Sequence, residues 1–153
     1  MKIFRRAFIN AYRDLKLDWK EISGDKSNPK ILECYETLTD LDIPENEWND
    51  DEISWCAAYM WKKLLDAGET EPKRSGMARS FLKYGKPVTI PIQGCIVVLE
   101  RGNDGVSGHV GFFIEFSDDT RRKFKLLAGN QSDQVCIKEF SVDSVLGYRI
   151  SND

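Results

Sequence analysis

The sequence predicts an α+β fold, with N-terminal helices packed on a C-terminal antiparallel sheet of about five strands. In the first half of the chain, apolar residues recur at the three- and four-residue spacing of helices. In the second half, short apolar segments alternate with turn-rich separators such as 102–105 and 117–120. Helical segments first and strand segments second indicate an α+β fold.

Two helices are expected before residue 45. Residues 3–16 carry one apolar face, made of Phe4, Phe8, Ala11 and Leu15. The loop 23–29 contains glycine, asparagine and proline and separates this helix from the next. The second apolar face consists of Ile31, Cys34, Tyr35, Leu38 and Leu41. Cys34 lies in that face, so we expect it to fill the core.

A third helix is predicted from about residue 55 to residue 67. Ser54 is a suitable N-cap, and Gly68 is a suitable residue to end the helix. A shorter helix is expected over 77–84. The strand-like segments that follow it are 95–100, 109–116, 124–128, 135–140 and 146–149.

The composition of the 153 residues fits one soluble domain, 1–153, with an N-terminal helix in 1–20 and a core in 21–150. The net charge of −3 argues against nucleic-acid binding. No apolar segment is long enough to span a membrane or to act as a signal peptide. We therefore expect synthesis in the cytoplasm. We also expect the protein to be a monomer.

The four cysteines are widely spaced and form no CxxC pair. With a single histidine in the chain, a structural zinc site is not expected, and the cysteines are interpreted as reduced. No metal or organic cofactor is predicted.

His109 is the only histidine, so histidine-dependent acid–base chemistry must use it. If the turn between the strands 109–116 and 124–128 is centred near residue 119, His109 lies opposite Gly129 or Asn130. Strand pairing alone therefore brings a side-chain amide beside the imidazole.

Cys56 falls in the first turn of the predicted third helix. Unpaired N–H groups and the helix dipole favour a thiolate there. Cys56, His109 and Asn130 together form a Cys–His–Asn set, a variant of the serine-protease triad. Each residue also has a plain structural explanation. The cysteine can fill the core, the histidine can be a hydrogen-bonded surface or core residue, and the asparagine can form a turn.

Several motifs, in this order, resemble those of papain-like cell-wall peptidases, and more narrowly the CHAP-type (cysteine, histidine-dependent amidohydrolase/peptidase) proteins found as phage lysins. They are the segments 51–59 (DEISWCAAY), 78–82 (ARSFL), 108–112 (GHVGF) and 129–131 (GNQ), with Glu21, Gly24, 28–32 and 146–149 fitting the same pattern. The similarity covers residues 20–150. Two departures are Cys95, where relatives usually carry aspartate, and Ala128, where relatives commonly carry glycine.

The resemblance implies a papain-like fold with Cys56 as nucleophile, His109 as general base and acid, and Asn130 as the residue that orients the imidazole. It implies hydrolysis of an amide bond of peptidoglycan, in the stem peptide, in the cross-bridge or at the glycan–peptide junction. Cys95 is expected either to pack or to serve as a second reactive thiol.

Three further residues have two interpretations each. Glu52, one helical turn before Cys56, either tunes the thiol or favours the helix N-terminus. Trp55 either lines a substrate groove or packs in the core. Gln131 either contacts the substrate or belongs to a turn. The acidic cluster 50–52 does not have the spacing of an EF-hand loop, so no calcium site is predicted.

The leading hypothesis is a phage endolysin that acts on the bacterial cell wall after release. A secreted antibacterial effector would use the same chemistry. Two further classes stay open: a non-catalytic virion or binding module that retains the fold, and a thiol acyltransferase or deamidase that acts on a host protein.

Overall fold

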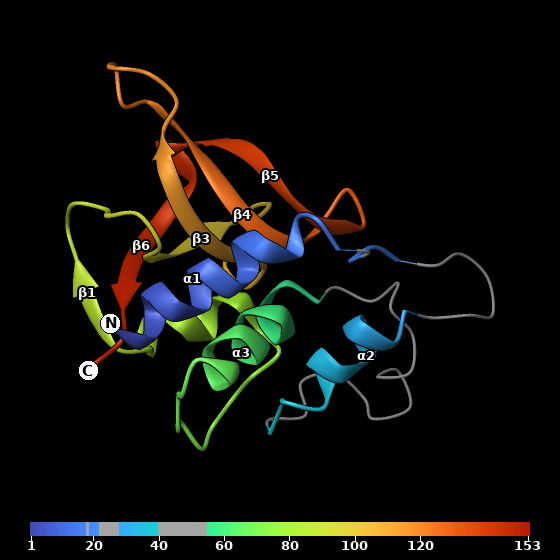
Figure 1. The fold of residues 1–153 in the computed structure, drawn as a ribbon. Coiled ribbons are helices and arrows are strands. Elements are labelled where there is room, and N and C mark those ends of the chain that lie inside the picture. Colours follow the sequence, from blue (N-terminus) through green and yellow to red (C-terminus); the bar gives the residue numbers. More distant parts are fainter. Residues whose placement is uncertain (18, 22–27, 40–54) are drawn as a thin grey trace.

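The computed structural model describes residues 1–17, 19–21, 28–39 and 55–153. The described helices are α1 (Ile3–Asp14), α2 (Pro29–Tyr35), α3 (Cys56–Asp66) and the 3-10 helices η2 (Ala78–Lys83) and η3 (Val142–Ser144). The strands are β1 (Lys86–Val88), β2 (Ile96–Glu100), β3 (Gly108–Phe116), β4 (Lys123–Gln131), β5 (Gln134–Ser141) and β6 (Val145–Ile150). Figure 1 shows the helices α1, α2 and α3 gathered on one side of the sheet.

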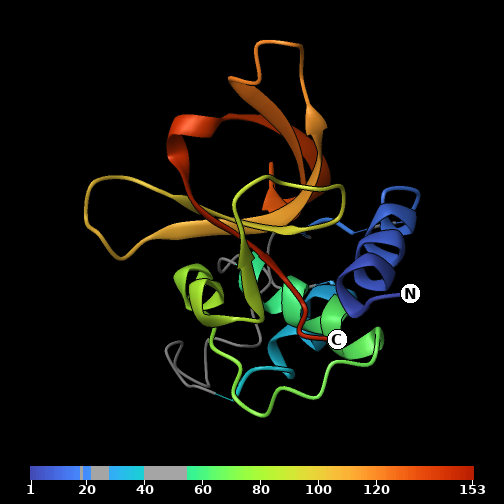
Figure 2. The same cartoon turned by 90° about the vertical axis from the view of Figure 1, so that its left-hand side faces the viewer.

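The described strands form one six-stranded sheet in the order β1-β6-β2-β3-β4-β5, and every pairing is antiparallel. The α+β prediction is therefore confirmed, with one strand more than the five expected. That strand is β1, which has three residues including Pro87 and pairs only with β6 at the sheet edge. A segment so short, with a proline in it, gives no strand pattern in the sequence. Figure 2 shows how strongly the sheet curls.

Residues on β3 alternate between two hydrophobic clusters, as the period of two in a strand requires. Phe112 packs with the helices α1 and α3, whereas Phe113 packs on the opposite face with Phe124 and Leu126. The predicted register of the hairpin is also found, because Phe112 pairs with Leu127. The helix α3 therefore lies directly against the strands that carry the candidate site.

A buried charge cluster joins α1 to α3. The ammonium of Lys63 lies 2.6 Å from a carboxylate oxygen of Asp14, and the hydroxyl of Tyr59 donates to the same oxygen at 2.7 Å. The ammonium also lies 4.8 Å from the centre of the Trp19 ring. Because both charges are buried, each depends on the other to offset its loss of water.

The ends of α3 differ in how well the sequence predicts them. Gly68 follows the helix with φ of 105°, which confirms it as the residue that ends the helix. The first helical residue is Cys56, so the N-cap position belongs to Trp55, whose side chain makes no capping bond, and not to Ser54.

The two ends of the chain lie side by side (Figure 1). The N–H of Phe4 donates to the hydroxyl of Ser151 at 3.2 Å, and the N–H of Ile3 donates to the carboxylate of Asp153 at 2.9 Å. Within the described ranges, no helix has the length and apolar character that crossing a bilayer requires.

We predict that Asp14→Asn lowers the free energy of unfolding by about 3 kcal/mol, because it leaves the ammonium of Lys63 buried without a counter-charge. Asp66→Asn is the matched control, since Asp66 pairs with Lys62 at the exposed surface of α3. The control should cost less than about 1 kcal/mol. Urea denaturation of both variants measures the difference, and equal losses would show that the cluster does not stabilise the contact between the helices.

Candidate active site

Cys56, His109 and Gln131 meet where the first turn of α3 lies against β3 and β4. Cys56 is the first residue of α3, His109 is the second residue of β3 and Gln131 is the last residue of β4. Their exposed fractions are 3%, 1% and 2%, so all three side chains are largely shielded from water. Polar side chains so deeply buried require partners, and those partners define the chemistry.

The imidazole of His109 is held by a side-chain amide. Its Nε2 lies 3.0 Å from Oε1 of Gln131. The ring also lies beside Phe140, with 5.7 Å between ring centres. One ring nitrogen is thus fixed by a polar partner on the neighbouring strand β4.

The orientation of the Gln131 amide determines which imidazole nitrogen carries the proton. Its Nε2 donates to the backbone carbonyls of Cys136 at 2.6 Å and Leu126 at 3.3 Å. Since both amide hydrogens point at carbonyls, Oε1 must face the imidazole and accept a hydrogen bond. Nε2 of His109 therefore carries the proton in the neutral ring, and Nδ1 keeps its lone pair.

Nδ1 of His109 is buried and has no nitrogen or oxygen atom as hydrogen-bond partner among the described residues. Since Nε2 is bonded to Gln131, we infer that Nδ1 is the nitrogen that faces the Cys56 thiol. In this arrangement the neutral ring is ready to take the thiol proton, and the protonated ring is ready to return it.

The pKa of the Cys56 thiol lies below its usual range. Burial alone would raise it, but a hydrogen bond to the side chain of His109 and the charge of His109 outweigh burial. A backbone hydrogen bond from Val110 and the charge of Arg101 lower it further. The unpaired N–H groups at the start of α3 also stabilise the thiolate, which lowers the pKa of Cys56 further.

The other three cysteines are not activated. Burial raises the pKa of Cys34 and of Cys95 to about 12, and burial also raises the pKa of Cys136. All four cysteines are unpaired. Cys34 therefore fills the core as predicted. Of the two alternatives for Cys95, packing in the core fits the structure.

The amide that contacts His109 belongs to Gln131, and not to Asn130 as the sequence predicted. Asn130 adopts φ of 56°, and the register between β4 and β5 shifts between Ala128 and Gln131. Such a bulge breaks the alternation of side chains along the strand. The side chain that follows the bulge therefore reaches the ring. The predicted proximity of this segment to His109 was correct, but the residue was wrong by one position.

Trp55 and Gly129 explain how closely α3 approaches the sheet. A Cβ atom at Gly129 would lie 2.5 Å from Cζ3 of Trp55, which is too close for two carbon atoms that are not bonded to each other. The indole of Trp55 is fully buried, and its N–H donates to Glu21 at 2.8 Å. Of the two interpretations of Trp55, packing in the core is the one that fits the structure. The contact between Trp55 and Gly129 also limits the distance between β4 and Cys56, the next residue in the chain.

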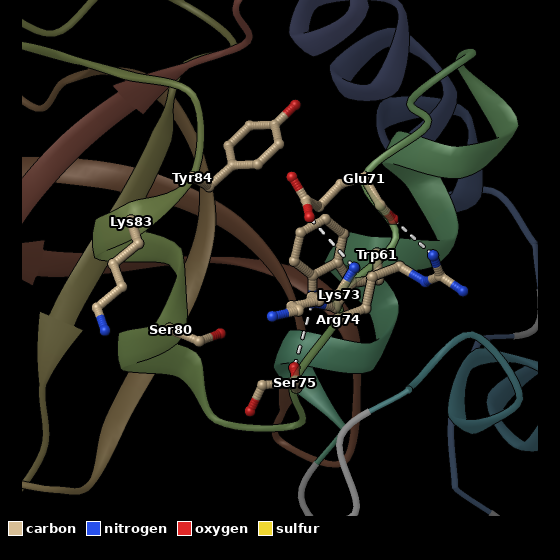
Figure 3. A pocket seen from close by; sticks show the side chains of 8 residues that line it. All are labelled: Trp61, Glu71, Lys73, Arg74, Ser75, Ser80, Lys83 and Tyr84. Atoms are coloured by element: carbon tan, nitrogen blue, oxygen red, sulfur yellow. Dashed lines mark hydrogen bonds between the residues drawn. The ribbon is translucent and has the colours of Figure 1, made fainter.

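A hollow of about 350 Å³ lies between α3, η2 and the segment 71–75 (Figure 3). Trp61 and Tyr84 stand at its wall, and the side chains of Lys73 and Lys83 are at its rim. None of Cys56, His109 and Gln131 lines it. This hollow is therefore separate from the cysteine–histidine pair.

Two predictions from the sequence fall on residues 40–54, which lie outside the described ranges: the role of Glu52 and the acidic cluster 50–52. Among the residues that the structure describes, no cluster of three or more histidine, cysteine or acidic side chains is arranged to hold a metal ion. Arg101 is the residue near the thiol that the sequence did not indicate.

We predict that iodoacetamide alkylates Cys56 with a half-maximal rate at a lower pH than a free thiol. The reason is that only the thiolate reacts, and the lowered pKa of Cys56 preserves the thiolate as the pH falls. The profile of Cys136 should be displaced in the opposite direction. Mass spectrometry of the labelled peptides measures both profiles, and a Cys56 profile at or above that of Cys136 would contradict the inferred thiolate.

Gln131→Ala should slow alkylation of Cys56 at neutral pH by roughly five- to ten-fold, since a hydrogen bond that fixes the ring contributes about 1 kcal/mol. Asn130→Gly is the matched control, because glycine accepts the positive φ at that position. It should label at nearly the rate of the unaltered protein. A slower rate in the glycine variant than in Gln131→Ala would return the orienting role to Asn130.

Comparison with known proteins adds no family: no protein-family model matches the chain, and no curated protein matches it. The resemblance to CHAP-type peptidases therefore stays a prediction from short motifs. The contacts among Cys56, His109 and Gln131 are the independent support for its chemistry.

Proposed function

We propose that this protein is a cysteine hydrolase that cleaves an amide bond of peptidoglycan with a Cys56–His109–Gln131 triad. The observation that carries the proposal is the coupling of a thiol of lowered pKa to an imidazole whose tautomer is fixed by Gln131. Core cysteines do not need such a partner, as Cys34 and Cys95 show.

The reaction divides into two steps. The Cys56 thiolate attacks the amide carbonyl, the carbon–nitrogen bond breaks, and His109 passes its proton from Nδ1 to the leaving amine. Water then attacks the carbonyl carbon of the thioester while Nδ1 of His109 accepts a proton from the water. The carbon–sulfur bond breaks, which releases the carboxylic acid and regenerates the thiolate beside the protonated ring. The hydrogen bond from Nε2 to Gln131 is kept in both steps, so the ring does not have to turn between them.

The start of α3 provides a place for the developing oxyanion. Backbone N–H groups in the first turn of a helix have no partner within the helix, and they point outward at its N-terminal end. An oxyanion formed on the carbon that bonds to Cys56 would lie next to these donors. The same groups therefore serve the thiolate first and the tetrahedral intermediate afterwards.

The choice of peptidoglycan as substrate depends on the motifs around Cys56, His109 and Gln131, which resemble those of CHAP-type lysins. A phage endolysin is the function we propose, and a secreted antibacterial effector would give the same products in vitro. No cofactor enters the proposed chemistry.

The test is digestion of purified sacculi by the unaltered protein and by Cys56→Ala, His109→Ala and Cys95→Ala. The first two variants should lose turnover by several orders of magnitude while they remain folded, because members of one catalytic unit fail together. Cys95→Ala is the control, since it removes a buried thiol of raised pKa from a hydrophobic cluster that does not contain Cys56. It should retain turnover.

Mass spectrometry of the released fragments identifies the bond that is cut. Full turnover by folded Cys56→Ala would remove the cysteine from the mechanism. Intact sacculi together with rapid, selective alkylation of Cys56 would keep the thiol chemistry and exclude peptidoglycan as the substrate. Slow and equal labelling of all four thiols would favour a non-catalytic module.

A further inference from the structure

Arg101 is an arginine whose charge acts on the thiol of Cys56, the candidate nucleophile. Arg101 follows the last residue of β2, and its N–H donates to the carbonyl of Ser107 at 3.2 Å, which extends the β2–β3 ladder by one pair. Leu99 lies opposite His109 in that ladder. Because alternate residues share a face, the side chain of Arg101 projects on the same face as that of His109.

The pairing also sets how close the two side chains are. Arg101 lies two residues beyond the direct partner of His109, which makes the two residues diagonal neighbours across the strand pair. Diagonal neighbours have Cα atoms about 7–8 Å apart, within reach of a long side chain. The charge of Arg101 is also felt at the Cys56 thiol, which agrees with this placement.

Two nearby charged groups, those of Arg79 and Asp104, already have partners. Arg79 donates from Nε to the carbonyl of Ser107 at 2.9 Å, and its charge acts on Asp104. The carboxylate of Asp104 accepts the N–H groups of Val106 and Ser107 at 2.9 and 2.7 Å. Arg101, in contrast, is exposed, and within the described part of the chain its guanidinium has no hydrogen-bond or ion-pair partner.

We propose that Arg101 binds a carboxylate of the substrate, next to the amide bond that Cys56 attacks, so that the site selects anionic acyl groups. The inference deepens the proposed function and rests on it for the identity of the nucleophile. A guanidinium presents several N–H donors in a planar fork that matches a carboxylate. Peptides of the bacterial cell wall carry free carboxylates, so such a residue would fix which amide bond is presented to the thiol.

Two thiol reagents of nearly equal size test the charge preference directly. Iodoacetate carries a carboxylate and iodoacetamide does not. Both form a bond from sulfur to carbon and release iodide. The rate ratio of iodoacetate to iodoacetamide at Cys56, divided by the same ratio for N-acetylcysteine, should be about five- to ten-fold higher in the unaltered protein than in Arg101→Gln, because charge-assisted hydrogen bonds to a carboxylate are strong.

Arg122→Gln is the matched control. It removes the same charge from an exposed arginine in the turn at the far end of β3, and its ratio should equal that of the unaltered protein. Added salt should also reduce the preference for iodoacetate. If Arg101→Gln slows both reagents equally, Arg101 acts on the thiol alone and the proposal is wrong.

A binding measurement makes the test independent of alkylation. In the unaltered protein, the NMR signal of the Arg101 Nε–H should shift and saturate with N-acetylglycine but not with N-acetylglycinamide. Equal behaviour of the two compounds would overturn the proposal. Carboxylate binding in a protein that leaves sacculi intact would retain this inference and refute only the proposed substrate.

Discussion

The candidate site depends on one amide that is held from two sides. Gln131 donates to the carbonyls of Cys136 and Leu126 and thereby turns its own oxygen toward His109. Those two carbonyls belong to the backbone of β4 and β5, so the sheet itself fixes the tautomer of the imidazole. The protonation of the His109 ring is therefore a consequence of the pairing between β4 and β5.

The second constraint is the position of α3. The buried pair of Asp14 and Lys63 ties this helix to α1, and the contact of Trp55 with Gly129 limits its distance from β4. Cys56 follows Trp55 directly in the chain, so the sulfur has little freedom relative to the ring. Helix packing and sheet geometry together supply an alignment that neither element has alone.

Much of this arrangement could be predicted from the sequence. Periodicity located the helices α1, α2 and α3, because each has an apolar face of ordinary length, and strand alternation located β2 to β6. The pairing of β3 with β4 followed from the position of their turn and brought the segment 129–131 to His109. The motif order supplied Cys56 as the partner on a helix.

The remainder depended on details that spacing does not encode. A single residue in the left-handed conformation, Asn130, moved the contact with the imidazole to Gln131. The buried partners Asp14 and Lys63 lie 49 positions apart in the sequence, and no pattern joins them. The diagonal position of Arg101 across from His109 depends on the pairing of β2 with β3, which the sequence did not predict. Tertiary contacts, and not local preferences, determine all three.

The absence of a side chain at Gly129 has a consequence for the evolution of this chain. Any side chain there would press on the indole of Trp55 and lift the start of α3 away from the sheet. Distant homologues of this chain should thus keep glycine at 129. An alignment anchored on that glycine would place the triad correctly, even where the amide that follows it has drifted along the strand.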